Sequence, residues 1–117
     1  MNQQKLTQVV TTITSAGAQC ALRTAEEVAV RMGLAVSIAV VDNVGNLVSF
    51  LRTGNACVTS IEASIRKART SANLSLPTKA LEDLLHGGLT SLLTFEFISP
   101  SQGGVPIIVD GVVVGAI

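Results

Sequence analysis

The C-terminal end of the sequence carries the feature that most constrains the fold: two β-branched runs separated by a tight turn signal. Residues 105–109 (Val-Pro-Ile-Ile-Val) and 112–117 (Val-Val-Val-Gly-Ala-Ile) flank Asp110-Gly111. An Asp-Gly pair between two such runs favours a two-residue turn in which both central residues take positive φ. The pattern therefore predicts an antiparallel β-hairpin.

A second hairpin is predicted nearer the start of the chain. The apolar run 35–41 is followed by the turn-forming residues 42–46 (Asp-Asn-Val-Gly-Asn), and residues 47–51 are again mostly apolar. Asp, Asn and Gly are common in turns because they bond to their own backbone or tolerate left-handed conformations. Both arms are almost continuously apolar, which is typical of strands that are covered on both faces.

Three segments around the hairpins have helical character. Apolar side chains recur at three- and four-residue steps over residues 4–32, a spacing that places them on one face of a helix. We expect a second helix over residues 59–73 and a short third one over 79–85, whereas residues 89–98 fit helix or strand equally well. The resulting fold class is α+β: an antiparallel sheet built from two hairpins, with helices packed on it.

Polar residues and glycines mark the expected helix ends. Thr59, with Glu62 three residues later, has the form of a capping box, and Thr78 is placed to cap the short helix. Gly33 is suited to end the first helix. Gly17 costs about 1 kcal/mol inside that helix relative to Ala, and it indicates either close approach of another backbone or a break between two helices.

Composition and charge exclude several functions. A chain of 117 residues suits a single domain over 1–117, and its formal net charge is zero, with 14% charged and 3% aromatic residues. Such a chain lacks the basic surface that nucleic acids and anionic membranes require, and the rings on which single strands stack. No apolar run of about 18 residues is present to span a bilayer. The first residues contain no apolar signal-peptide core, so the expected location is cytoplasmic.

The low charged fraction also predicts contact with another subunit. With 48% apolar residues and so few charges, we expect part of the apolar surface to be covered by a second copy of the chain. The interfaces of obligate homo-oligomers have this character.

The titratable sulfur and imidazole groups do not predict a metal site. Cys20 and Cys57 have no metal-ligand spacing, and His86 is the only histidine. We expect both cysteines to be reduced, buried thiols, although the sequence leaves a disulfide between them open.

Six short segments form an ordered set that covers nearly the whole chain. They are Val40-Val41-Asp42, Gly45-Asn46, Arg52, Lys67-Ala68, Gly103-Gly104-Val105-Pro106-Ile107, and the run from Asp110-Gly111 to Gly115-Ala116-Ile117. In this order the segments resemble the signature of the GlcG/HbpS-like family, which includes the C-terminal domain of PduO-type proteins.

The resemblance implies a profilin-like fold in α/β/α layers and a strong tendency to form homo-oligomers. It also implies a ligand, since some members bind haem or other tetrapyrroles, while others belong with glycolate, glycerol or propanediol metabolism. The chain departs from the family pattern because no "GVSG" segment and C-terminal helix follow residue 117, so one helical cover of the sheet is expected to be missing. Unlike some iron- or haem-binding members, it has no Glu-x-x-Glu spacing and no histidine in its first 85 residues.

The candidate ligand-binding residues are Arg52, Lys67, Gly103, Gly104 and Pro106, with His86 as the candidate cofactor ligand. A guanidinium at position 52 could hold a carboxylate or haem propionate through two hydrogen bonds, or it could pair with Asp42. Asp42 itself is explained by an Asx-turn. Lys67 could point into a pocket between helix and sheet, or extend into solvent.

For the segment 103–106 and for His86, a purely structural role is the alternative to ligand binding. The segment 103–106 could form the rim of a pocket and offer backbone N–H groups to an anion, or it could simply lead into the hairpin. His86 could ligate haem iron, or it could be an exposed residue at the end of a helix.

The leading interpretation is an oligomeric small-molecule-binding protein, with haem or another tetrapyrrole as the ligand. The alternative is an accessory enzyme that acts on a small hydroxy or oxo acid or an aldehyde, with Arg52 holding the carboxylate and Lys67 acting as electrophile or acid. Whether the chain is an enzyme stays open, because no general base is identifiable. A structural or assembly subunit is the third interpretation.

Overall fold

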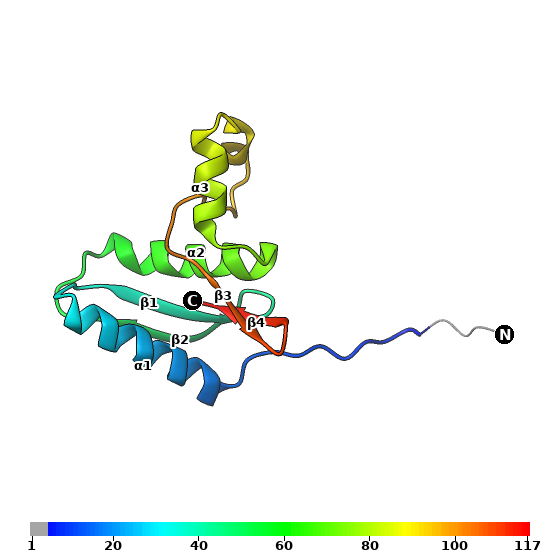
Figure 1. Ribbon diagram of the computed structural model, residues 1–117, viewed down its shortest axis with the longest axis horizontal. Helices are drawn as coiled ribbons and strands as arrows, with labels where there is room; N and C mark the ends of the chain where they lie inside the picture. The colour runs from blue at the N-terminus through cyan, green and yellow to red at the C-terminus, as the bar shows by residue number, and fades with distance from the viewer. Residues whose placement is uncertain (1–4) are drawn as a thin grey trace.

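A four-stranded antiparallel sheet forms the centre of the molecule in the computed structural model, which describes residues 5–117 (Figure 1). The strands are β1 (Ser37–Asp42), β2 (Leu47–Arg52), β3 (Pro106–Val109) and β4 (Val112–Ala116), in the order β2-β1-β4-β3. Both predicted hairpins are confirmed. In the β3–β4 turn Asp110 and Gly111 have φ of 51° and 77°, as the Asp-Gly pair predicts.

Helices cover both faces of the sheet. The helices are α1 (Ser15–Arg31), α2 (Thr59–Leu74) and α3 (Thr78–His86), followed by the 3-10 helix η1 (Thr90–Thr94). Figure 1 shows α1 and α2 on opposite sides of β1. This arrangement confirms the predicted α+β class and the three layers. No helix within residues 5–117 is long and apolar enough to cross a membrane.

Alternating side chains of β1 build two separate core clusters. Ile38 and Val40 pack with Ala18 and Leu22 of α1 on one face. On the other face, Ala39 and Val41 pack with small side chains of α2 and β4, namely Ala68, Ala72 and Ala116. The predicted cover on both faces is confirmed for β1, whereas β2, at the edge of the sheet, is only partly buried.

The predicted start of the first helix is wrong. The helix was expected over residues 4–32, but it begins at Ser15; residue 4 lies outside the described part of the chain. The Ile13 N–H instead donates to the Val114 carbonyl of β4 at 2.9 Å, and the Thr14 hydroxyl caps the helix by accepting from Gly17 N–H at 3.0 Å. A run of β-branched residues before Ser15 suits this extended backbone better than a helix.

Gly17 and Gly33 lie near the two ends of α1. Gly17 lies in the first turn, so it marks no break between two helices, and a Cβ there would lie 3.1 Å from the Ile13 side chain. Gly33, with φ of 68°, follows the C-cap Met32, which confirms its predicted role in ending the helix.

The two predicted threonine caps are wrong. Thr59 and Thr78 are the first residues of their helices rather than the residues that precede them, and neither helix has a side-chain cap. The Thr59 hydroxyl instead lies 3.3 Å from Cys57 Sγ, while the buried Thr78 hydroxyl binds the backbone of Gly104. The Thr59 hydroxyl is thus engaged by a local contact and the Thr78 hydroxyl by a tertiary one, so neither caps its helix.

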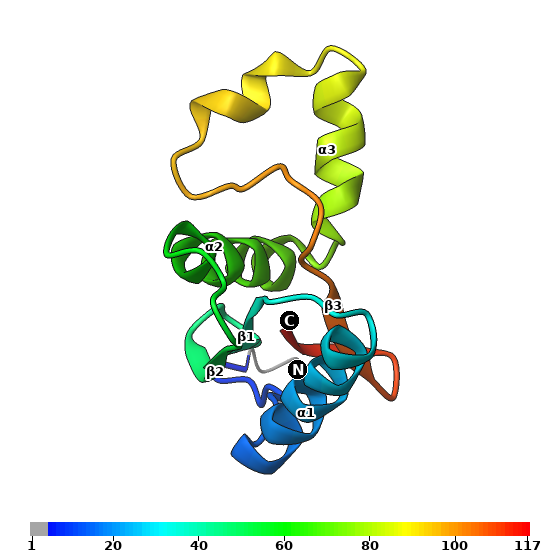
Figure 2. The same cartoon turned by 90° about the vertical axis from the view of Figure 1, so that its left-hand side faces the viewer.

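The segment that was ambiguous between helix and strand belongs to a lobe formed by α3 and η1. Figure 2 shows this lobe standing away from the sheet beyond α2. Phe95 and Phe97 pair edge-to-face within it, with ring centroids 6.1 Å apart. The chain returns to α2 through the Ser99 N–H, which donates to the Thr70 hydroxyl at 3.0 Å.

Close backbone approach between β1 and β4 depends on Gly115. A Cβ at this position would collide with the Val41 carbonyl oxygen and lie 3.3 Å from the Ile13 side chain. Only glycine therefore allows β4 to pass β1 at this distance.

We expect Gly115→Ala to destabilise the fold by about 1–3 kcal/mol, because the added methyl group overpacks this contact. Urea unfolding followed by circular dichroism measures the change. Gly87→Ala is the control: its φ is −77° and its nearest neighbours lie at 3.4 Å or more, so the loss should stay within about 0.5 kcal/mol. Equal losses in the two variants would contradict the assignment.

Candidate functional site

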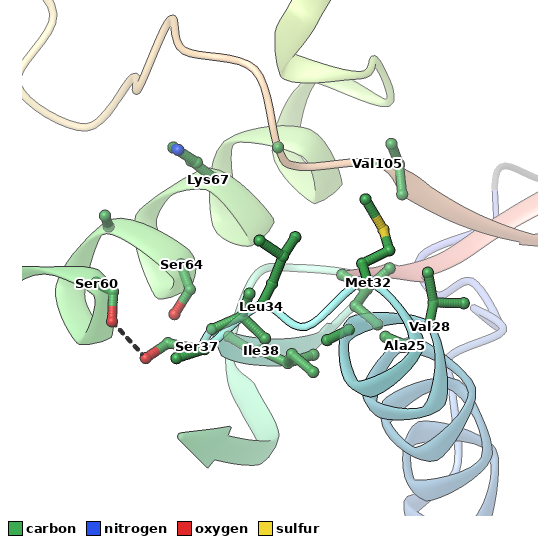
Figure 3. Close-up of a pocket in the computed structure, with 17 residues that line it drawn as sticks. Ala25, Val28, Met32, Leu34, Ser37, Ile38, Ser60, Ser64, Lys67 and Val105 are labelled. Atoms are coloured by element: carbon green, nitrogen blue, oxygen red, sulfur yellow. Dashed lines mark hydrogen bonds between the residues drawn. The ribbon is translucent and has the colours of Figure 1, made fainter. Parts of the chain in front are cut away.

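A cavity of about 540 Å³ lies between α1, α2 and the first half of β1 (Figure 3). Its volume falls within the range of about 300–1,000 Å³ that is usual for small-molecule sites. The lining residues are Ala25, Val28, Ala29, Met32, Leu34, Ala35, Val36, Ser37, Ile38, Ala39, Ser60, Ala63, Ser64, Lys67, Gly103, Val105 and Ile117.

The cavity has two unlike walls. Apart from Ser37, the α1 and β1 side is built from aliphatic side chains and the thioether of Met32. The α2 side presents Ser60, Ser64 and Lys67, whose four- and three-residue spacing places them on one face of the helix. Figure 3 shows Ser60 and Ser64 pointing toward β1, whereas the Lys67 side chain extends along the rim of the hollow. The arrangement suits a ligand with an apolar body and a polar end.

Hydroxyl groups fix one end of the polar row. Ser37 Oγ and Ser60 Oγ lie 2.6 Å apart and share a hydrogen bond between β1 and α2. Ser60 Oγ also donates to the Cys57 carbonyl at 2.6 Å, and Ser64 Oγ donates to the Ile61 carbonyl at 2.9 Å. The hydroxyl oxygens still have acceptor capacity toward a ligand.

Among the described residues, Lys67 brings the only charged side chain to the cavity lining. It is half-buried, and its stem lies against the loop that closes the cavity: a Cβ on Gly103 would sit 3.1 Å from Lys67 Cδ and 3.4 Å from Nζ. Within residues 5–117 the structure records one ion pair, Lys79–Asp83 at 2.9 Å, so Lys67 has no carboxylate partner in that part of the chain. An unpaired ammonium beside an apolar wall favours an anionic group there.

The glycines predicted for the site hold the loop against α2. Gly103 has φ of 142° and lines the cavity, whereas Gly104 is buried, and a Cβ on it would collide with the Lys67 carbonyl oxygen. The Thr78 hydroxyl accepts from the Gly104 N–H at 2.9 Å, and the Thr78 N–H donates to the Gly104 carbonyl at 2.9 Å. The loop is thus both a rim of the cavity and a packed structural turn.

The structure brings Lys67 and Gly103 together, but it does not bring the other candidates into the lining. Arg52 is exposed at the end of the edge strand β2, and Pro106 begins β3 just beyond Val105. His86 is exposed at the end of α3, in the lobe that stands away from the sheet.

Asp42 has the structural role that the sequence predicts. Its Oδ1 accepts from the N–H groups of Val44 at 3.0 Å and Asn46 at 2.9 Å, which confirms the Asx-turn. The alternative pairing of Asp42 with Arg52 does not occur, since Lys79–Asp83 is the ion pair recorded among the described residues.

The sequence reasoning missed several lining residues. Met32 and Leu34 lie just after α1, and Ser60 and Ser64 precede Lys67 on α2. The serines could have been found from their spacing, because a polar row at four- and three-residue steps on an otherwise amphipathic helix is a recognisable signal.

A second hollow of about 550 Å³ lies along the same glycine loop. Its lining includes Lys79 and Asp83, which are paired with each other, and hydrogen bonding to Asp83 raises the pKa of Lys79. Because its charges are already matched, this hollow offers less attraction to a charged ligand than the cavity beside Lys67.

Both cysteines are free thiols, but the prediction that they are buried is wrong. Cys20 lies on the exposed side of α1, and Cys57 lies in the turn before α2. The hydrogen bond with the Thr59 hydroxyl, followed by that from the Ser60 backbone, lowers the pKa of the Cys57 thiol below its usual value of 9.0. Within residues 5–117 no three His, Cys, Asp or Glu side chains gather where they could hold a metal ion.

We expect Thr78→Val to destabilise the protein by about 1–3 kcal/mol, because the buried Gly104 N–H loses its acceptor. Ser71→Ala is the matched control: Ser71 is also fully buried, but its hydroxyl has no hydrogen-bond partner, so its removal should be neutral or stabilising. Thermal unfolding of both variants measures the difference. If Ser71→Ala lowered the stability as much as Thr78→Val does, the role given to the Thr78–Gly104 hydrogen bond would be contradicted.

Comparison with known proteins gives three findings of family and fold. The family model described as "Haem degrading protein HbpS-like" matches residues 13–117. Protein GlcG of Escherichia coli strain K12 is 35% identical over 92 residues, which cover 79% of this chain and 69% of GlcG. Among solved structures, protein ORFY of Klebsiella pneumoniae superposes with a TM-score of 0.91 at 31% identity, covering 98% of this chain and 82% of ORFY.

A more distant solved structure shares the fold alone. The PduOC:heme complex has a TM-score of 0.79 at 22% identity, and the match covers 90% of this chain and 79% of PduOC.

Proposed function

Because the chain belongs to the HbpS-like family of haem-degrading proteins, we propose that it binds a small amphipathic ligand in the cavity between α1 and α2, and that this ligand is haem. The resemblance seen in the sequence motifs is thereby confirmed at the level of the family and the fold.

One observation carries the proposal: the unpaired ammonium of Lys67 at the edge of an apolar cavity. A carboxylate placed beside Nζ would form a charge-assisted hydrogen bond, while the rest of the ligand would displace water from aliphatic side chains. A haem molecule has both parts, since its propionates extend from a large apolar ring. PduOC, which shares the fold, was solved with heme bound and makes haem the first ligand to test.

The residues of the cavity fit the ring and propionates of haem. The aliphatic wall would contact the ring, and Lys67 with Ser64 would meet a propionate. Met32 supplies a thioether, a known type of haem-iron ligand, whereas no histidine lines the cavity. Bound haem would supply a redox-active iron centre to the site.

The geometry favours binding over the alternative of an enzyme for small hydroxy or oxo acids. That alternative needs Arg52 to hold a carboxylate close to Lys67, and Arg52 does not line the cavity. Among the described residues, no Asp, Glu or His side chain that could act as a general base lines the cavity.

We expect hemin to give a saturable change in the Soret band when it is titrated into the protein. Lys67→Met should weaken this binding about tenfold or more, because a charge-assisted hydrogen bond is lost while the apolar stem is kept. Lys79→Met is the matched control, since Lys79 is paired with Asp83 outside this cavity. The absence of a saturable change, or equal effects of the two substitutions, would overturn the proposal.

Two further variants locate the iron. Met32→Leu keeps the apolar volume but removes the sulfur, so the position of the Soret band should change. His86→Ala should leave both the affinity and the spectrum unchanged, because His86 lies outside the cavity lining. The reverse result would place the iron at the α3–η1 lobe and not in the cavity.

We also propose that the chain forms homo-oligomers, as its low charged fraction predicts. In support, large apolar side chains are exposed on α1, the sheet edges and the α3–η1 lobe, among them Val30 at 69%, Ile108 at 59% and Leu93 at 67%. Sedimentation velocity of the full chain should show a species larger than a monomer at micromolar concentration. A single monomeric species would contradict this part of the proposal.

A further inference from the structure

We propose that the N-terminal arm, residues 5–12, leaves its own subunit and pairs as an extra strand with β3 of a second copy. The inference rests on the self-association proposed above, and it names the segment and the surface that meet. It is independent of ligand binding, since the arm does not line the cavity.

The arm exposes apolar side chains that its own subunit does not cover. Val9 is 100% exposed, Leu6 92% and Val10 60%. Figure 1 shows the segment running away from the body of the molecule. Its sequence, Lys-Leu-Thr-Gln-Val-Val-Thr-Thr, is rich in β-branched residues and contains no proline or glycine, which suits a strand.

Hydrogen bonds hold the chain at residues 12 and 13, where the arm joins the body of the subunit, and they set the direction in which the arm leaves. Ile13 N–H donates to the Val114 carbonyl at 2.9 Å, and the Asn43 N–H donates to the Thr12 hydroxyl at 3.2 Å. The arm therefore leaves the subunit beside the β3–β4 hairpin (Figure 1). At about 3.3 Å per residue, its eight residues reach roughly 26 Å beyond that point.

The sheet has an open apolar edge beside this departure point. β3 is the last strand of the sheet, and its residues Ile108 and Val109 are 59% and 51% exposed. Pro106, at the start of β3, has no N–H to donate, but the exposed strand edge after it can serve as a template for a strand from another chain.

Charge favours the β3 edge over the opposite edge, β2. Lys5 is the only charged residue of the arm. An antiparallel register on β3 can set Lys5 opposite Asp110, in the turn that follows this strand, whereas the equivalent register on β2 sets it opposite Arg52. Opposite charges across neighbouring strands stabilise pairing, and like charges disfavour it.

Two copies can make this exchange reciprocally. The arm departs from the same hairpin that receives the partner's arm, so two subunits related by a two-fold axis exchange both arms in one closed interface. With Lys5 opposite Asp110, the register places Thr7 opposite Ile108.

The register gives a direct test by disulfide formation. In a background with Cys20→Ser and Cys57→Ser, we mix Thr7→Cys protein with Ile108→Cys protein under mild oxidation and expect a mixed disulfide dimer. The control mixture is Val9→Cys with Val48→Cys, the pair that the same pairing would bring together on β2. Cross-linking of the control to an equal or greater extent would overturn the assignment to β3.

A second measurement separates this inference from self-association in general. Val9→Asp should raise the dimer dissociation constant at least tenfold, whereas Val58→Asp, at a site 74% exposed outside the arm, should not. Circular dichroism of both variants verifies folding. A monomeric wild type would overturn the arm exchange together with self-association; an oligomer unaffected by Val9→Asp would overturn the arm exchange alone.

Discussion

The packing of β1 between two helices is the contact on which the rest of the molecule depends. Its alternating side chains supply both core clusters, and each cluster joins β1 to a different helix. The cluster under α2 is built almost wholly from Ala and Val, so the helix lies close to the sheet. Small side chains bury less apolar area each than large ones, and the stability must therefore come from the closeness and number of such contacts.

The cavity is a consequence of this layered arrangement. It lies where the end of α1, the start of β1 and the polar face of α2 meet. The glycine loop at residues 103–104 enters at this end because no side chain there blocks its approach to Lys67. Small side chains bring α2 close to the sheet, and the two glycines bring the loop close to Lys67 at the edge of the cavity.

Much of the fold could be predicted from the sequence because its signals are local. Asp110-Gly111 and Asp42 determine their turns through their own backbone preferences and hydrogen bonds. The start of α1 could not be predicted in this way. It is decided by the hydrogen bond between Ile13 and Val114, which are 101 residues apart, and this long-range bond outweighs the helical spacing of the preceding apolar residues.

The candidate site was predictable only in part. Lys67 and Gly103 were identified from the family motifs, and they do meet at the cavity. Met32 and Leu34 carry no local signal, because their importance arises when the end of α1 is folded over β1. Arg52 and His86 matched expectations of chemistry, but the topology places one on an edge strand and the other on a projecting lobe.

The distribution of aromatic rings has an optical consequence. The chain has no Trp or Tyr, and its three Phe rings lie outside the cavity: Phe50 packs against the core, while Phe95 and Phe97 pair on the lobe. The apoprotein is therefore almost transparent at 280 nm and has no indole emission. The absorption of a chromophore bound in the cavity would therefore overlap very little with absorption by the protein. No Phe ring lines the cavity, so none would stack on the chromophore there and shift its absorption.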